Sequence, residues 1–457
     1  MSGSRDILLK RIRSGGTLSL GEQFRLALSL SYPAMLAQLS SVMMQYIDTS
    51  MVGHLGASAG AAIGLVSTCL WLMGGFCMAV TSGFSVQVAH AIGADDFARA
   101  RDVLRQGLIC ALGFSGIVAL LGIAVSGALP HWLGGGEDIA ADASEYFRSM
   151  SLFIPAMLLD WICAAMLQAS GNMKVPSILS IGMCVLDVGF NYLFIYRMGM
   201  GVKGAAIGSG LAELITGLAM FSFLVFGSKE LRLTGEKWHF HLSRKTLSKA
   251  AGISGPMALQ NLLMRGGYIA ATVIVAPLGT IAIAANSFAI TAESFCYMPG
   301  YGISDAATTL VGQSVGAGRA PLARRFAWIT TSLGMGIMGI LALAMFIFAP
   351  QLMGLLSPDR EVIDLGASVL RIEAFAEIGY AASIVGYGVC VGAGDTRWPS
   401  IFNFGSMWIV RLLPAIFLTP VLGLKGFWIC MAADLVVRGI LFVTRLRGGR
   451  WLKIQQG

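Results

Sequence analysis

Five polar side chains inside long apolar stretches are candidates to bind or exchange a small cation. Asp48 lies near the far end of the first stretch, while Asp187 and Asn191 are four residues apart, as are Ser209 and Glu213. That spacing puts each pair on one face of a helix. At a rise of about 1.5 Å per residue, all five reach one layer in the outer half of a membrane. Their oxygens suit a hard cation such as sodium, and neighbouring carboxyls in a dry pocket can also exchange a proton near neutral pH.

Each of these residues also has a plainer interpretation. Asp48 could make a structural hydrogen bond at a helix end, and Ser209 could bond its own backbone, as hydroxyls in membrane helices often do. Glu213 could be a neutral structural acid. A charge at the centre of a membrane helix costs roughly 2.5–3.5 kcal/mol or more, so such residues are functional candidates by default. The residues alone do not choose between sodium and a proton.

A second polar set is expected in the C-terminal half of the chain, at middle depth. It contains two bases and two acids, which suggests a buried network that neutralises itself. Arginine does not readily lose its proton, so its charge must be paired. A structural or gating network and direct contact with cargo both remain open for this set: Arg265, Glu293, Glu377 and Arg411.

Other chemistries find little support in the sequence. The eight cysteines lie in apolar runs without a CxxC pair and read as buried thiols, neither disulfides nor metal ligands. The five histidines are scattered, and only His239 and His241 are close together, in a polar segment. No GxxxxGK[ST] motif is present, so ATP hydrolysis by this chain is not expected. A membrane-bound acyl or glycosyl transferase is the alternative class, but the sequence predicts neither an enzyme nor a resident metal or cofactor.

The composition indicates that most of this chain lies in a lipid bilayer. Of 457 residues, 56% are hydrophobic and only 12% are charged, against roughly 25% charged in a soluble domain. The sequence therefore predicts an all-α integral membrane protein. A secreted disulfide scaffold, a disordered chain and a nucleic-acid binder are excluded despite the net charge of +8. A β-barrel is excluded because its strands would alternate apolar and polar residues.

Twelve apolar stretches are long enough to span a bilayer, which takes about 20 residues. The basic, polar first 25 residues lack the apolar core of a cleavable signal peptide. The expected spans are residues 27–52, 60–88, 106–128, 147–169, 177–197, 204–227, 251–276, 281–308, 327–349, 366–392, 399–420 and 424–444.

The spans are expected to form two six-helix lobes. The N-lobe would cover residues 27–227 and the C-lobe residues 251–444. A cytoplasmic segment (1–26), a linker (228–250) and a tail (445–457) would flank them. If the termini and even-numbered loops share one side, that side holds 23 of the 32 Lys and Arg residues, against five on the other side and four within spans. This bias places both termini in the cytoplasm.

The two halves repeat one another. Pro33 matches Pro256, Gly93 matches Gly316, and the stretch SGNMKVPSI at 170–178 matches AGDTRWPSI at 393–401. Each pair has the same offset in sequence number (256 − 33 = 223). Six helices return the chain to its starting side, so the repeats are parallel, and such pseudo-symmetric halves enclose a substrate cleft in many secondary transporters. The architecture predicted is therefore that of a transporter.

Several stretches resemble the multidrug and toxic compound extrusion (MATE) family over roughly residues 25–445. They are QYIDTSMVGHLG, FNYLFIYRMGMGVKGAAIGS, ESFCYMPGYGISDAATTLVGQSVGAG and GAGDTRWP. The chain is most similar to bacterial members, especially the DinF-like branch. The resemblance implies twelve helices in two lobes and export of organic, often cationic compounds in exchange for protons or sodium ions.

The resemblance also implies roles for individual residues. Asp48 matches the family's essential aspartate in the first helix, Asp187 and Asn191 match a pair in the fifth, and Ser209 matches a hydroxyl in the sixth. The family commonly places Asn first and Asp or Asn second, whereas this chain has Asp then Asn, so no ion preference carries over. Met264 stands where one branch has a carboxylate, and Ala271 is the repeat partner of Asp48. Ion coupling is therefore expected in one lobe only.

The function expected is secondary active multidrug efflux by rocking-bundle alternating access. The alternative is a lipid-linked precursor flippase of the same wider superfamily. The expected location is the bacterial inner membrane. The expected partners are small-molecule substrates and membrane lipid, with no nucleic acid, and the chain is expected to act as a monomer.

Overall fold

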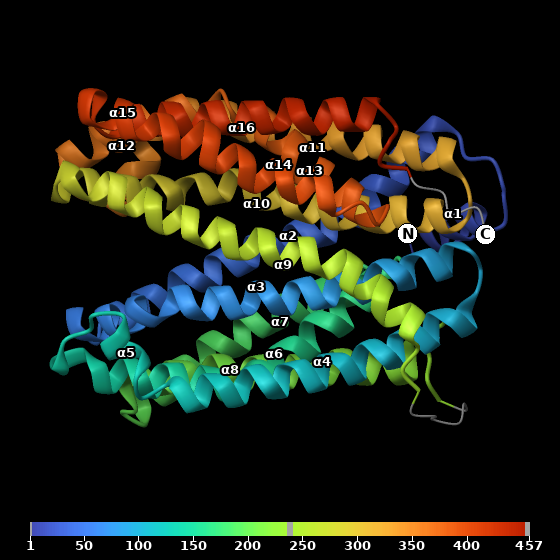
Figure 1. The fold of residues 1–457 in the computed structure, drawn as a ribbon, viewed down its shortest axis with the longest axis horizontal. Coiled ribbons are helices and arrows are strands. Elements are labelled where there is room, and N and C mark those ends of the chain that lie inside the picture. The colour runs from blue at the N-terminus through green and yellow to red at the C-terminus, as the bar shows by residue number, and fades with distance from the viewer. Residues whose placement is uncertain (1, 235–240, 453–457) are drawn as a thin grey trace. The chain divides into compact units, whose positions relative to one another are not determined.

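The computed structural model describes residues 2–234 and 241–452, and nearly all of this part is helical (Figure 1). Eleven of its helices are long and apolar enough to cross a membrane, and a bent pair, α12 and α13, makes a twelfth span. The expected twelve-span, all-α fold is confirmed. Most helices extend a few residues beyond the apolar stretches from which they were predicted. The expected linker 228–250 shows this best, since α9 already begins at Arg244, while residues 235–240 lie outside the described residues.

The chain divides into two compact units. Unit 2 is residues Ser40–Ala258, and unit 1 is Met1–Leu39 together with Leu259–Gly457. The divisions fall inside α2 (Leu20–Gly53) and α9 (Arg244–Val275), rather than in the segment between the halves. The lobe boundaries expected from the sequence stay a prediction.

Unit 2 is built around α3, α4, α6 and α8, whose buried side chains form one large apolar core. A four-residue helix, α5, follows α4 and was not anticipated. Short π-helices continue α7 and α8. Besides parts of α2 and α9, the elements of unit 2 are α3 (Ala57–Gly93), α4 (Phe97–Val125), α5 (Leu129–Trp132), α6 (Glu137–Ala169), α7 (Lys174–Asn191), η1 (Tyr192–Arg197), α8 (Gly201–Ser222) and η2 (Phe223–Gly227).

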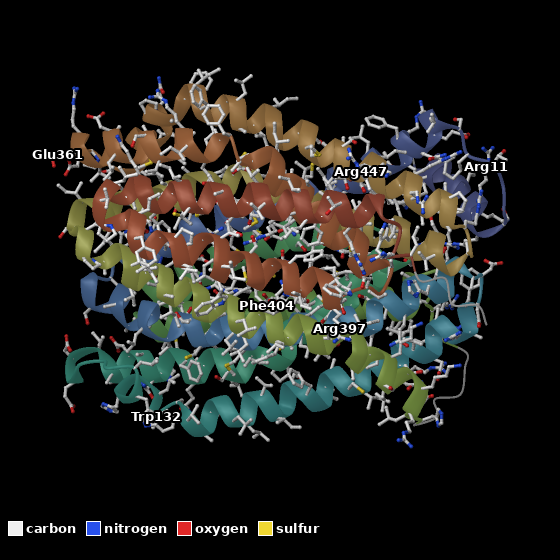
Figure 2. The ribbon with its side chains drawn as sticks, turned by 45° about the horizontal axis from the view of Figure 1, so that its top comes forward. Arg11, Trp132, Glu361, Arg397, Phe404 and Arg447 are labelled. Carbon is white, nitrogen blue, oxygen red and sulfur yellow. The ribbon has the colours of Figure 1, made fainter. Side chains whose placement is uncertain are left out.

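Unit 1 carries its own apolar core, mainly from α10, α11, α12 and α16. In this unit Arg11 and Arg447 lie toward one end and Glu361 lies at the other (Figure 2). Besides parts of α2 and α9, its elements are α1 (Ser2–Arg13), η3 (Ala276–Leu278), α10 (Thr280–Gly316), α11 (Ala320–Leu356), α12 (Arg360–Ala374), α13 (Glu377–Gly392), α14 (Arg397–Ser406), η4 (Met407–Leu412), α15 (Leu413–Leu422) and α16 (Leu424–Arg447).

The tenth span differs from the single helix expected over 366–392. It is bent by 59° between α12 and α13. Phe375, at the break, is 76% exposed. Glu373 and Glu377 were expected within one continuous helix. In the structure they flank the break between α12 and α13.

The repeat is visible in the backbone of the turns. Gly171 and Gly394, which are partners in the repeat, both adopt a left-handed conformation, with φ of 89° and 79°. Each closes the same turn, since the amide of Asn172 donates to Leu167 O at 3.0 Å and that of Asp395 donates to Cys390 O at 2.9 Å. A glycine at this position avoids the steric cost that a side chain would add. The expected repeat is confirmed at atomic detail.

Close helix packing in unit 1 depends on hydroxyls and glycines. Across α10 and α13, Ser304 Oγ donates to Ile384 O at 3.0 Å and Thr308 Oγ1 donates to Gly388 O at 2.9 Å. Small residues let membrane helices approach closely enough for such bonds. A Cβ on Gly388 would lie 2.6 Å from the carbonyl oxygen of Ser304, a backbone atom with little freedom to move.

We therefore expect Gly388→Ala to destabilise the protein by about 1–3 kcal/mol, the usual cost of overpacking a core. Thermal unfolding of the purified protein in detergent measures the effect. Gly336→Ala on α11 is the matched control, because nothing lies within 4 Å of a Cβ there. An equal unfolding midpoint for the two variants would contradict the role assigned to the α10–α13 contact.

Candidate functional site

The side chain of Asn191 joins two carboxyl groups in unit 2. Its Nδ2 donates to Asp48 Oδ1 at 3.0 Å and to Asp187 Oδ2 at 3.2 Å. Asp187 and Asn191 are each 1% exposed, and Asp48 is half-buried and also interacts with Asp187. Three of the five residues expected to lie together are thus in direct contact.

The fold places Asn191 by two local features. Asn191 is the last residue of α7, immediately before the π-helix η1; π-helical turns are rare and often occur at functional sites. On the other side Gly208 of α8 packs against it, because a Cβ on Gly208 would lie 3.0 Å from Asn191 N and would overlap Oδ1. The amide is therefore held between its own helix and the bare backbone of the next.

The other two expected residues, Glu213 and Ser209, lie on α8. Glu213 is half-buried on α8 and interacts electrostatically with Asp187 and with Asp160 of α6. Its Oε2 is buried without a hydrogen-bond partner, as is Oδ1 of Asp160. Ser209 is half-buried and makes no hydrogen bond to the other four within the described residues.

This arrangement can hold a proton or a small cation. Two carboxyls this close, in a site with little water, cannot both carry an uncompensated charge. No Lys or Arg forms an ion pair with Asp48, Asp187 or Glu213 within the part of the chain that the structure describes. Oδ1 of Asn191 is buried without a hydrogen-bond partner, so it is an available third oxygen ligand. We call Asp48, Asp187 and Asn191 the carboxyl–amide cluster.

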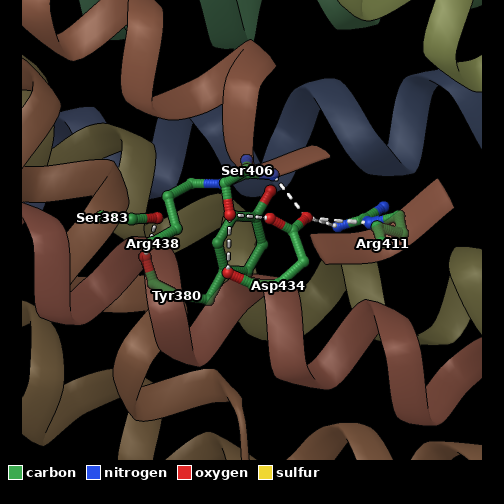
Figure 3. Close-up of polar contacts among 6 residues, drawn as sticks. All are labelled: Tyr380, Ser383, Ser406, Arg411, Asp434 and Arg438. Carbon is green, nitrogen blue, oxygen red and sulfur yellow. Dashed lines mark hydrogen bonds and ion pairs between the residues drawn. The ribbon is translucent and has the colours of Figure 1, made fainter. Parts of the chain in front are cut away.

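A different polar cluster lies in unit 1 (Figure 3). Asp434 of α16 is fully buried and accepts from Arg411 Nε at 2.9 Å and from Arg438 Nη2 at 2.5 Å. Ser406 also donates to its carboxylate. One carboxylate thus holds two permanent cations. We call Ser406, Arg411, Asp434 and Arg438 the arginine cluster.

The network expected in this half included only Arg411 of these four residues. Glu293 is buried and lies in the electrostatic field of Arg411, but no ion pair joins them. Arg265 lies over the ring of Tyr268, with 5.7 Å from its guanidinium carbon to the ring centroid. Glu377 begins α13 and is fully buried, and its carboxyl group interacts with the thiol of Cys296 on α10.

Some of these contacts could be predicted from the sequence and others could not. Asp434 and Arg438 are four residues apart on one helix, a spacing that often supports ion pairs. Tyr146 of α6 lies in the electrostatic field of both aspartates of the carboxyl–amide cluster, and nothing in the sequence singles it out. The approach of Gly208 to Asn191 is a tertiary contact that no spacing within either helix announces.

Comparison with protein families agrees with the repeat. The MatE family model matches twice, at residues 33–193 and at 256–417. The chain belongs to the MatE family. The starting points of the two matches, 33 and 256, reproduce the offset found within the chain.

Curated relatives match over nearly the whole chain. A probable multidrug resistance protein NorM of Thermotoga maritima is 28% identical over 445 residues, which is 93% of this chain and 92% of that protein. The multidrug resistance protein MdtK of Yersinia pestis is 24% identical, over 94% and 96% of the two chains. These names favour export over the flippase alternative. Membership of the DinF-like branch stays a prediction.

Solved structures share the fold. An outward-facing multidrug resistance MATE family transporter superposes with a TM-score of 0.89 at 19% identity, over 97% of this chain and 98% of that one. A transporter of the MOP superfamily from Pyrococcus furiosus gives a TM-score of 0.90 at 19% identity, over 98% and 99%. The MATE transporter VcmN of Vibrio cholerae, in its bent form, gives 0.86 at 19% identity, over 95% and 99%.

We expect the stability of the protein to depend strongly on Asp434, the carboxylate of the arginine cluster. Removing this carboxylate leaves two buried guanidinium groups without their common partner, and breaking a buried ion pair from one side typically costs about 3–5 kcal/mol. We expect Asp434→Asn to destabilise the protein by about that amount in thermal unfolding. As the control, Glu145→Gln breaks the exposed pair with Lys203 at 2.7 Å and should cost less than about 1 kcal/mol. Equal losses in the two variants would contradict the structural role of the cluster.

Proposed function

We propose that the chain is a secondary active exporter that exchanges organic, often cationic compounds for protons or sodium ions. The observation that carries the proposal is the carboxyl–amide cluster, in which one buried amide bridges two carboxyls. Family membership and the names of the relatives support multidrug efflux as the activity. The protein would act as a monomer in the bacterial inner membrane, with both termini in the cytoplasm.

The cluster is suited to an ion that binds and is released during transport. Asn191 donates to both carboxyls, and these hydrogen bonds are compatible both with one proton shared between the carboxyls and with a cation that neutralises them. With no Lys or Arg paired to them among the described residues, Asp48 and Asp187 depend on a mobile ion for charge balance. Loss of that ion leaves a net negative site, which would favour a different packing of the surrounding helices or attract a cationic cargo.

The energy for export comes from the ion. A membrane potential of 100 mV contributes about 2.3 kcal/mol for each charge that moves inward, and an ion gradient adds to this. Ion binding at the cluster would favour one conformation of an alternating-access cycle, and cargo binding would favour the other. A ligand shifts such an equilibrium only by its difference in affinity for the two states.

The arginine cluster would play a different part. Its two cations are both paired to Asp434, and they stay charged because arginine keeps its proton. We propose a structural or gating role for it, in which it fixes α16 against η4 and α14. Direct contact with cargo by Arg265, Glu293 or Glu377 remains a hypothesis for the same half.

Transport by the reconstituted protein tests the proposal. In liposomes that carry either a pH gradient or a sodium gradient, the wild type should move ethidium under at least one of them. Asp48→Asn removes one ionisable carboxyl and should reduce gradient-driven efflux to the level of protein-free liposomes. Asp142→Asn, which changes an exposed acid on α6, should transport like the wild type.

Two results would overturn parts of this account. A wild type that moves no dye under either gradient would argue against multidrug export, and lipid-linked substrates would then be tested. Normal gradient-driven transport by Asp48→Asn would leave an exporter but move its ion site elsewhere.

A further inference from the structure

A polar pocket of about 250 Å³ lies in unit 2, away from the carboxyl–amide cluster. It is formed where the first turns of α4 and α9 meet the last part of α3. Three of its lining residues are cations and one is an acid; the others are neutral and polar. The lining residues are Gln87, Arg99, Asp102, Ser243, Lys245, Thr246 and Lys249.

Two buried glutamines build this pocket. Gln106, which is fully buried, donates to Asp102 Oδ2 at 2.8 Å and accepts from the amide of Ser243 at 2.9 Å. Gln87 donates to Thr246 O at 3.2 Å. The segment that begins α9 is thereby fastened to α3 and α4.

These hydrogen bonds hold three cationic side chains around one pocket. Lys245 and Lys249 are four residues apart on α9, so both extend from one face of the helix. Lys249 lies in the electrostatic field of Lys245 and of Arg99 from α4. The one lining carboxylate, on Asp102, accepts from Gln106 and can offset at most one of the three positive charges. The lining therefore keeps a net positive charge, which a bound anion would complement.

The second half of the repeat shows which features come from the fold alone. A pocket of about 510 Å³ lies at the equivalent place in unit 1, since its Leu20 is the repeat partner of Ser243. Arg324 and Arg325 line it, but Leu20, Trp328 and Ile329 make the rest of it largely apolar. The hollow therefore follows from the repeated architecture, whereas of these two pockets the one in unit 2 has the polar lining with three cations.

The depth of the pocket points to the source of the anion. Lys245 and Lys249 lie within the first two turns of a candidate span that runs from Arg244 to Leu278, so they are within about 8 Å of its start. The distribution of Lys and Arg predicts that this end faces the cytoplasm. Phospholipid phosphates lie at this level of a bilayer, and anionic lipids attract basic residues there.

We propose that Arg99, Lys245 and Lys249 bind the phosphate of an anionic phospholipid of the cytoplasmic leaflet. Arg99 would contribute a planar, two-pronged donor and the lysines compact point charges, a combination suited to phosphate. Ser243 and Thr246 lie beside them in the lining and supply hydroxyl donors. The lipid would join α3, α4 and the start of α9.

Native mass spectrometry of the full-length protein in detergent, titrated with dioleoylphosphatidylglycerol, tests the site. The double variant Lys245→Gln/Lys249→Gln should lose one tight lipid-binding event, with affinity at least tenfold weaker. Arg244→Gln removes a neighbouring charge outside the pocket and should bind like the wild type. Lys245→Arg/Lys249→Arg keeps the charges and should retain the event, which shows that loss in the first variant reflects charge.

Three results would overturn the proposal. One is equal binding of phosphatidylglycerol by the double glutamine variant and the wild type. Another is equally tight binding of dioleoylphosphatidylcholine, which would show that net charge is not recognised. The third is displacement of the lipid by millimolar inorganic phosphate, which would assign the site to a soluble anion.

Discussion

The cost of an unbalanced charge in a low-dielectric interior governs the polar structure of this protein. Each buried ionisable group must be neutralised, paired or removed from the membrane. Unit 1 meets this constraint with arginines that stay charged, held by Asp434. In unit 2 the carboxyls of the carboxyl–amide cluster have no Lys or Arg partner among the described residues, and we propose that an ion from outside balances their charge. Unit 1 also buries Glu293 and Glu377 without a Lys or Arg partner in the described part of the chain. The two units therefore differ in the paired arginine network, which only unit 1 shows among the described residues.

This difference arises within a repeated topology. The turns at Gly171 and Gly394 share their geometry and hydrogen bonds, and the family model matches both halves with the offset of the internal repeat. Side chains and local backbone, rather than topology, therefore distinguish the two halves. The pockets at the equivalent ends of the two units follow the same rule, polar with three cations in unit 2 and largely apolar in unit 1.

Apolar length predicted the spans closely, because a bilayer requires about 20 apolar residues in each. The helical spacing of Asp187 and Asn191 also predicted part of the site, since contacts within one helix are fixed by its geometry. Contacts between helices were harder to predict. The partner of Arg411 is Asp434, 23 residues away on another helix, and no proline marks the 59° bend beside Glu377. Such features arise from tertiary packing, which hydropathy and spacing do not encode.

We propose that the carboxyl–amide cluster links ion binding to cargo binding. The most direct measurement is the affinity of the purified protein for ethidium as proton and sodium concentrations are varied separately. Linkage requires that an ion which competes with cargo weakens cargo binding, and that cargo weakens ion binding by the same factor. We expect such a dependence on one of the two ions in the wild type and its loss in Asp187→Asn. An undiminished dependence in Asp187→Asn would contradict it.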